Sequence, residues 1–502
     1  MRGFLASSVG VTCAAALALP LTLPAPAQAG TPGSPSEAAV PGSTRSLPLV
    51  PLSGERALGP AASEQGLARR DVKPFSLVGI VWDDPDSELN GRVQVRTRAV
   101  GTDRWSDWQD VDTHNHEHAA DPDTAEGTSR RVRGSTAPLW VGDSDGVEVR
   151  VDAERVPGTG EGARESPEQS SAEGPVGSSA ERPGGRYGVG PEKRRPAAPA
   201  DSLPRGLRLE LVDPGGTAPG TAARTGAARP GTRVGSTDGD QGIGESEGDL
   251  GAGMTGGEPD EGAGAWNGSE SAGANEIAAL SREETEREYL PDEFGERRAQ
   301  PFIGPRPRII TRHGWGANEN LRERGFVYTK KVKAAFVHHT ASGNKYSCSQ
   351  VPSIIRSIYR YHVVSSGWRD IGYNFLVDKC GNIYEGRAGG VAKAVKGAHT
   401  LGFNTNSMGI AVLGNFGNTK PSDAALKAVS RLTAWKLGLY GANPRGKTYL
   451  TSAGGNLYRK GKNVRLNVIS GHRDGFSTEC PGRLLYGKLG SARKTAAGYQ
   501  GR

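Results

Sequence analysis

The segment GHRDGFSTECPG, residues 471–482, places a histidine and a cysteine eight positions apart near the end of the chain. A second segment, VHHT at residues 337–340, closes an apolar run with two further histidines. One imidazole from the second segment, with the imidazole and thiol of the first, is enough to hold Zn²⁺ and leave a fourth coordination position open. Because an open position distinguishes catalytic from structural zinc, the two segments together predict a catalytic zinc site.

Length and composition indicate how the chain is divided into domains. The chain has 502 residues with 73 glycines and 33 prolines, which is too long for one domain and too rich in helix and strand breakers to be ordered throughout. The net charge of +7 conceals an asymmetry, because residues 301–502 carry 32 Lys and Arg against 8 Asp and Glu. We expect this cationic part to be attracted to polyanions such as nucleic acid, lipid headgroups or anionic wall polymers.

The N-terminal sequence indicates which of these polyanions the protein would meet. Residues 1–29 combine an early arginine, an apolar run at 4–23 and small residues at 27–29, as in a secretory signal peptide. A transmembrane anchor is the weaker interpretation, since the run is short and is interrupted by Pro20 and Pro24. No later segment is long and apolar enough to span a membrane. The sequence thus predicts a secreted, cell-wall-associated protein whose partners exclude nucleic acid and include anionic wall polymers.

The cysteines support export and the metal site. Four are present, and Cys13 would leave with the signal peptide, so Cys348, Cys380 and Cys480 remain. In an oxidising compartment two would pair. Cys348 just before a predicted helix and Cys380 in a predicted turn are suited to a disulfide. Cys480 is then left for metal ligation, the alternative being an inert buried thiol.

The region before residue 300 is predicted to contain a β-rich module between low-complexity stretches. We predict a low-complexity segment at 30–71, an all-β module at 72–213 with a low-complexity insertion at 157–200, and a disordered linker at 214–300 that holds one short acidic helix at 278–289. The module is expected to be a sandwich, because apolar and polar residues alternate in several stretches. These stretches are residues 93–98, 147–152 and 207–211.

One motif in the module contains three alternating histidines, HNHEH at residues 114–118. On a strand all three would face one way and could hold a metal. We favour a solvated polar loop, since the stretch also carries Asp and Glu neighbours.

Residues 301–495 have the pattern of an α/β domain, in which helices cover a mixed sheet and ligand residues lie near strand ends. Strands are predicted at 332–339, 373–378, 383–385, 408–413 and 464–469, and helices at 350–365 and from 421 to about 438.

Seven motifs in this domain match one known family. They are RIIT at 308–311, GWGA at 314–317, VHHT at 337–340, GWRDIGYNF at 367–375, YEGR at 384–387, GAH at 397–399 and GHRDGFSTECPG at 471–482. The stretch 305–490 resembles the peptidoglycan recognition proteins and the zinc N-acetylmuramoyl-L-alanine amidases related to them. The N-terminal module more loosely resembles β-rich extensions of exported bacterial members, and no function is carried over from it.

The resemblance implies that His338, His472 and Cys480 are the zinc ligands. On a strand His338 and His339 point to opposite faces, so only one can reach the ion. The family pattern selects His338, with His339 as the alternative.

The resemblance also implies the reaction, hydrolysis of the amide between N-acetylmuramic acid and L-alanine of peptidoglycan. Zinc would activate water. Tyr373 and Thr478 would donate hydrogen bonds to the negative charge that develops on the carbonyl. Phage members carry lysine at the position of Thr478, so Tyr373 is expected to contribute more here.

The residues implied for the substrate groove form two sets. His362, His399 and Asn404 would line the groove for the muramyl stem peptide, although His362 also falls on the apolar stripe of its predicted helix. Gly367, Trp368 and Arg387 accompany a preference for diaminopimelate, whose extra carboxylate a guanidinium can pair with bidentately. The sequence departs from the family at 388–391, where AGGV replaces the usual Gly-Trp-Asn stretch.

Three functions remain open from the sequence. The favoured one is a secreted, monomeric, zinc-dependent N-acetylmuramoyl-L-alanine amidase. The alternative is a non-catalytic peptidoglycan-binding protein, a class that typically lacks the cysteine ligand. An adhesion or scaffold protein acting through the β-module is the third.

Overall fold

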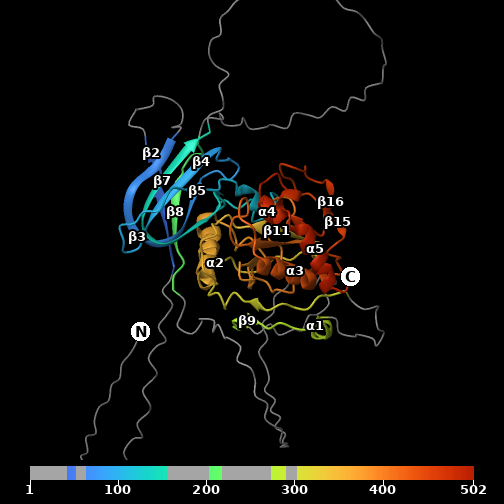
Figure 1. The fold of residues 1–502 in the computed structure, drawn as a ribbon. Coiled ribbons are helices and arrows are strands. Elements are labelled where there is room, and N and C mark those ends of the chain that lie inside the picture. The colour runs from blue at the N-terminus through green and yellow to red at the C-terminus, as the bar shows by residue number, and fades with distance from the viewer. Residues whose placement is uncertain (1–41, 53–63, 155–202, 217–272, 290–301) are drawn as a thin grey trace, which may run out of the picture. The chain divides into compact units, whose positions relative to one another are not determined.

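The computed structural model describes residues 42–52, 64–154, 203–216, 273–289 and 302–502 (Figure 1). The predicted signal peptide, the insertion at 157–200 and most of the predicted linker lie outside these residues. None of the helices described is long and apolar enough to cross a membrane.

The N-terminal module is an antiparallel sheet of eight strands in the order β1-β8-β3-β7-β4-β5, with β2 and β6 also paired to β3 (Figure 1). Its strands are β1 (Ser43–Pro48), β2 (Val50–Pro51), β3 (Glu64–Trp82), β4 (Gly91–Ala99), β5 (Gln109–Val111), β6 (Gly134–Ser135), β7 (Leu139–Ala153) and β8 (Arg208–Asp213).

The predicted start of this module at residue 72 is wrong. Strands β1 and β2 and the first part of β3 precede that position, within the stretch assigned to low complexity. β1 pairs with β8 along its whole length, from Ser43 opposite Asp213 to Pro48 opposite Arg208. It is an edge strand with mostly unburied side chains, so main-chain pairing holds it where the apolar pattern is weak.

The strands form one hydrogen-bonded sheet, in place of the two sheets predicted for a sandwich. β3 is 19 residues long and shifts register against β7 three times between Leu67 and Leu77. Such irregularities bend a strand and increase its twist. The sheet therefore curls over its own apolar core, which includes Ile80, Val95 and Val149.

The opposite face of β3 belongs to a second core. Leu77 and Val81, with Val212 of β8, are fully buried against the helix α2 (Val351–Arg360) of the C-terminal domain. Burying an aliphatic side chain is worth about 1.5–3 kcal/mol. The two domains consequently share a hydrophobic core across this face.

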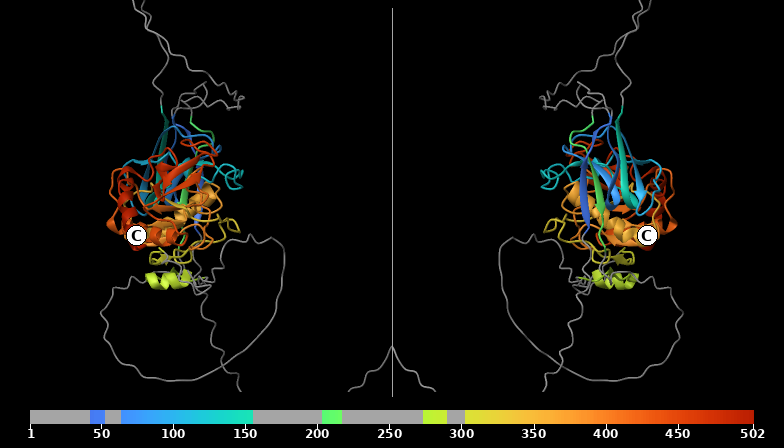
Figure 2. Two further views of the ribbon diagram at one scale, coloured as in Figure 1. Left: turned by 90° about the vertical axis from the view of Figure 1, so that its right-hand side faces the viewer. Right: turned by 90° about the vertical axis from the view of Figure 1, so that its left-hand side faces the viewer.

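The C-terminal domain has a seven-stranded mixed sheet in the order β17-β11-β14-β12-β13-β10-β9. Figures 1 and 2 show the helices and strands of residues 302–502 in yellow, orange and red. The strands of the sheet are β9 (Glu276–Ile277), β10 (Ile309–Ile310), β11 (Ala334–His339), β12 (Phe375–Val377), β13 (Ile383–Glu385), β14 (Ser407–Val412) and β17 (Ile469–Gly471), and a separate hairpin joins β15 (Lys447–Thr451) to β16 (Asn463–Asn467).

Helices cover the mixed sheet, as predicted, and they lie on both of its faces. On β14, Ile410 packs in the core with α3 (Asp423–Gly438) and α5 (Leu489–Tyr499), whereas the adjacent Ala411 packs in the core with α2. α3 begins where predicted, because the Ser422 hydroxyl accepts a hydrogen bond from the Ala425 amide as an N-cap. The predicted helix at 350–365 is α2 followed by a π-helical turn, η3 (Tyr361–Ser365). A short helix, α4 (Arg483–Tyr486), precedes α5.

Part of the predicted linker is ordered. β9 pairs with β10 at the sheet edge, and α1 (Arg282–Tyr289) forms where the short acidic helix was expected. The Tyr289 ring lies 5.9 Å from that of Trp435 in α3, so burial of an aromatic side chain fixes this helix on the domain.

Candidate metal centre and substrate groove

Two neighbouring parallel strands bring the first two candidate ligands together. β11 pairs with β17 in a register that sets Val337 opposite Gly471, and a histidine follows each of these two residues in the chain. His338 and His472 therefore leave the same edge of the sheet, with ring centroids 4.6 Å apart. Both side chains are completely buried.

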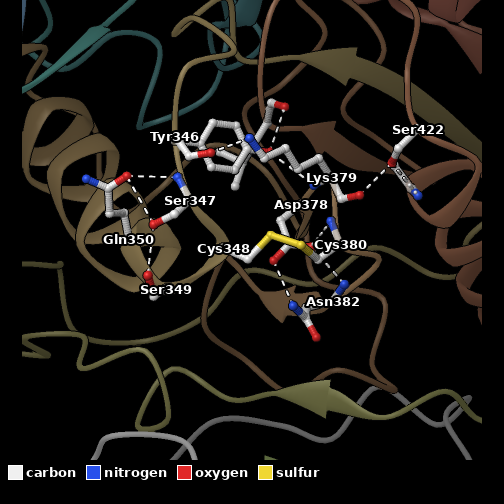
Figure 3. The surroundings of a disulfide bond; sticks show 12 residues. Tyr346, Ser347, Cys348, Ser349, Gln350, Asp378, Lys379, Cys380, Asn382 and Ser422 are labelled. Atoms are coloured by element: carbon white, nitrogen blue, oxygen red, sulfur yellow. Dashed lines mark hydrogen bonds between the residues drawn. A yellow bond between two sulfur atoms is a disulfide. The ribbon is translucent and has the colours of Figure 1, made fainter. Parts of the chain in front are cut away.

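Cys480 completes the predicted set. Its Sγ lies 3.8 Å from His338 Nδ1 and accepts a hydrogen bond of 3.4 Å from the main-chain amide of His339. It is a buried free thiol. The other two cysteines of the domain, Cys348 and Cys380, are joined to each other in a disulfide (Figure 3).

His339 is not a member of this cluster. Its Nδ1 accepts a hydrogen bond from the amide of Phe416 at 3.4 Å. Alternate side chains of a strand face opposite sides of the sheet, so a structural position for His339 follows from the position of His338.

A fourth candidate ligand comes from the N-terminal module. His118 ends the 3-10 helix η1 (His116–His118), and its Nε2 lies 3.6 Å from Cys480 Sγ. One ligand atom from each of His118, His338, His472 and Cys480 lies within 4.8 Å of the others. The solvated loop favoured from the sequence is therefore wrong for His118, whereas the side chain of His114 is 82% exposed. The alternating histidines indicated a possible metal site, but the sequence did not show that the other ligands lie in the C-terminal domain.

The donor set fits zinc. Both ring nitrogens of His472 and the Nδ1 of His118 are buried without a hydrogen-bond partner, which is costly unless a ligand takes up the lone pair. Burial, reinforced by neighbouring histidines, lowers the pKa of His338 and of His472 well below the ordinary value, so both rings are neutral. Burial raises the pKa of the Cys480 thiol, and a cation is what would stabilise its thiolate. Neutral imidazoles and one thiolate are typical zinc ligands.

The two predicted catalytic residues lie beside this cluster. The ring of Tyr373 is 5.6 Å from that of His338, and burial raises the pKa of its phenol well above the usual range, so it keeps its proton. The Thr478 hydroxyl donates a 2.8 Å hydrogen bond to Glu117 of the N-terminal module. Burial raises the pKa of this Glu117 carboxyl to about 6.

The predicted groove residues differ in what surrounds them. His399 Nδ1 lies 3.3 Å from His338 Nε2, which fits a role in orienting that ring. His362 is buried with its ring 4.4 Å from that of Trp368, and its Nδ1 accepts from the Gly372 amide at 3.3 Å. His362 and Trp368 are thus packed together under the groove.

The remaining groove positions contact the loop between β5 and β6, residues 112–133, which we call the groove loop. Arg387 forms two hydrogen bonds of 2.8 Å with Glu126. The Asn404 side-chain amide donates to Asp121 at 2.9 Å. Gly367 has a φ of 77°, and its Cα faces the main chain of Arg131 so closely that a Cβ would clash.

A small cavity remains between the groove loop and the metal cluster. Its volume is about 120 Å³, and Glu117, His118, Tyr373, Thr478 and Cys480 are among its lining residues. Pockets for small organic ligands are ordinarily about 300–1,000 Å³. The cavity beside the cluster is therefore smaller than an ordinary ligand pocket while the groove loop is in place.

Known proteins resemble both halves of the chain. The family N-acetylmuramoyl-L-alanine amidase matches residues 328–483, and the family Rv3811 N-terminal galactose-binding domain-like matches residues 32–178. Peptidoglycan-recognition protein SC1a of Drosophila melanogaster is 31% identical over 185 residues, which are 36% of this chain and 83% of that protein. The N-acetylmuramoyl-L-alanine amidase of Homo sapiens is 32% identical over 192 residues, 38% of this chain and 29% of that protein.

Solved structures are also similar to part of the chain. Drosophila PGRP-LB wild-type is 26% identical, covers 37% of this chain and 93% of its own, and gives a TM-score of 0.30. The sequence relatives confirm the resemblance inferred from the motifs. The chain belongs to the family of peptidoglycan-recognition proteins and N-acetylmuramoyl-L-alanine amidases.

Proposed function

We propose that the chain is a secreted, zinc-dependent N-acetylmuramoyl-L-alanine amidase that cleaves the amide between muramic acid and L-alanine of peptidoglycan. One observation carries the proposal. Two neutral imidazoles at the ends of paired parallel strands meet a buried free thiol, and both nitrogens of one imidazole lack a partner. A protein that only binds peptidoglycan would not require two imidazoles and a thiol in this arrangement.

His338, His472 and Cys480 would hold the zinc, with the His399 ring orienting His338. Zinc bound there supplies a Lewis acid for the activation of water and of the scissile carbonyl. Tyr373 holds a phenolic proton beside the cluster and donates it as a hydrogen bond to negative charge developing on the carbonyl oxygen. The Thr478 hydroxyl is a second donor once it is released from Glu117.

Arg387 is the residue proposed for the stem peptide. Its guanidinium already holds a carboxylate in a bidentate pair, which is the geometry that an extra carboxylate of diaminopimelate would use. Gly367, Trp368, His362 and Asn404 would shape the groove around it. The signal peptide predicted at 1–29 and the Cys348–Cys380 disulfide support secretion, because disulfides persist in oxidising compartments.

A non-catalytic peptidoglycan-binding protein is the second candidate, and the presence of Cys480 in the cluster disfavours it. The two are separated by incubating zinc-loaded protein with purified peptidoglycan and analysing the soluble products by mass spectrometry. We expect stem peptides with a free L-alanine amine from the variant with a released loop described below, and none when that variant also carries Cys480→Ala. Binding of peptidoglycan with no such product, by the wild type and by the loop variant described below, would show a binding protein.

A further inference from the structure

We infer that the groove loop, residues 112–133 of the N-terminal module, is a built-in occupant of the amidase groove that keeps the chain latent. His118 supplies a fourth metal ligand, and Glu126 takes the place of a substrate carboxylate on Arg387. The inference rests on the proposed function in one respect, since it takes the groove to be the site for the stem peptide.

The first contact closes the metal centre. His118 Nε2 lies 3.6 Å from Cys480 Sγ, and the His118 ring centroid is 4.5 Å from that of His472. Zinc sites with four protein ligands are structural, and catalytic sites keep one position for water or substrate. With His118 in the set, the ion has no position left for either.

The second contact occupies the guanidinium of Arg387, which would bind a carboxylate of the substrate. Both oxygens of Glu126 accept from Arg387, and the amide of Arg369 donates to Glu126 at 3.2 Å. Glu126 and Arg387 are only 8% and 9% exposed. A stem-peptide carboxylate can reach this guanidinium only after Glu126 has left.

In the third contact, the loop binds polar groups between the metal cluster and Arg387. One carboxylate oxygen of Asp121 accepts from the Gly402 amide at 3.0 Å and from the Asn404 side chain at 2.9 Å, and the other lies 3.2 Å from Lys396 Nζ. The Leu401 amide donates to the carbonyl of Glu117 at 2.9 Å. These donors are the kind that a peptide substrate would need.

Contacts outside the groove hold the module in position. The Tyr361 hydroxyl donates to the carbonyls of Ile80 and Thr136, and Ser365 donates to Glu210 at 2.9 Å. Leu77 and Val81 are buried against α2. Because this interface is separate from the groove, the loop stays at high effective concentration even when it has left the groove. Only the fraction of molecules with the loop displaced can bind substrate, and the apparent affinity falls by that fraction.

The test uses the full chain carrying His118→Ala and Glu126→Gln together, called the open variant. The control carries His114→Ala and Thr128→Ala, which change two exposed side chains of the same loop. Two readouts do not depend on turnover. One is the visible spectrum of cobalt-substituted protein titrated with azide, and the other is calorimetric binding of a diaminopimelate-containing muramyl tripeptide.

We expect azide to leave the wild-type and control cobalt spectra unchanged and to shift that of the open variant. We expect the muramyl tripeptide to bind the open variant at least about tenfold more tightly than the wild type, which corresponds to about 1.4 kcal/mol. His118→Gln, which keeps a side chain of similar size, covers the case in which the alanine variant does not fold. The azide titration of the wild type needs no variant at all.

The inference is overturned if azide shifts the wild-type spectrum as it shifts that of the open variant, or if both proteins bind the tripeptide equally. Equal and measurable rates of peptidoglycan cleavage by the two would also overturn it, while leaving the amidase intact. An open variant that binds azide and tripeptide but cleaves nothing supports the loop as occupant, and it is the proposed function that then fails.

Discussion

The guanidinium of Arg387 and the carboxylate of Glu126 meet in two hydrogen bonds of 2.8 Å, although 261 positions separate them in the chain. The pair is almost fully buried and joins the two domains at the groove. Removing one member leaves the other charge buried without its partner, which costs about 3–5 kcal/mol in proteins.

Arg387→Ala should therefore lower the free energy of unfolding by about 3–5 kcal/mol in urea denaturation. Arg92→Ala is the control, because the pair of Arg92 with Asp110 is 62% exposed on both sides and such exposed pairs contribute little to stability. Equal losses in the two variants would contradict the importance of the buried pair.

The same pair predicts a dependence of stability on pH. Burial opposes ionisation of Glu126, but the charges of Arg387 and Arg369 prevail and lower its pKa below that of an unfolded glutamate, about 4.3. The pair therefore stabilises the fold at neutral pH, and this contribution is lost as the pH falls through the folded-state value. We expect the difference in unfolding free energy between wild type and Glu126→Gln to be greatest above about pH 5 and to shrink toward pH 3. A difference that is constant over this range would rule out the linkage.

Cys480→Ala should lose the metal. Loss of even an outer-shell partner weakens metal binding about 10–100-fold, and a direct ligand should contribute more. Metal analysis after dialysis checks this directly. A chelator should lower the melting temperature of the wild type and of His114→Ala, and leave that of Cys480→Ala unchanged. A metal content in Cys480→Ala equal to that of the wild type would remove this thiol from the ligand set.

Tyr373→Phe tests the phenol as a hydrogen-bond donor. In the open variant, the substitution should lower kcat for amide cleavage by about 10²–10³-fold, because one donor to the developing oxyanion is lost. Metal content and KM should stay the same. Tyr384→Phe is a matched control, since that buried hydroxyl donates to Asp378 and has no contact with the metal cluster. Comparable losses of kcat in both variants would point to a structural effect.

Leu77→Ala tests the shared core between the domains. The side chain is fully buried beside α2, and truncation of a buried leucine costs about 2–5 kcal/mol. Calorimetry of the wild type should show the two domains unfolding in one transition, and the variant should melt at a lower temperature. Leu457→Ala, at a site 43% exposed, should change stability by about 0.5 kcal/mol or less. Two separate transitions in the wild type would contradict a shared core.

The sequence predicted most of the C-terminal domain because its signals are local. The apolar run that ends at His338 is β11, Ser422 caps α3, and the spacing of His472 and Cys480 is set within one short segment. The alternation of side chains along a strand showed that only one of His338 and His339 could reach the ion, and the resemblance to the family selected His338.

The predictions that failed depended on partners far away in the chain. β1 has few apolar side chains and exists through its pairing with β8, which lies beyond the insertion. The irregularities that turn a predicted sandwich into one curled sheet are visible only in the pairing of β3 with β7. His118 was missed because 362 positions separate it from Cys480, and three alternating histidines in a polar stretch do not show which of them reaches another domain.

Because β11 pairs with β17, the backbone fixes the positions of the two histidines, whereas the proposed chemistry also requires a metal. His338 and His472 are held apart at a distance fixed by the backbone of adjacent strands, so the sheet needs no ion to keep its shape. Under the proposed function, exchange of Cys480 would remove the metal and leave the backbone of the groove unchanged. On such a scaffold, one substitution would separate a protein that cleaves peptidoglycan from one that only binds it.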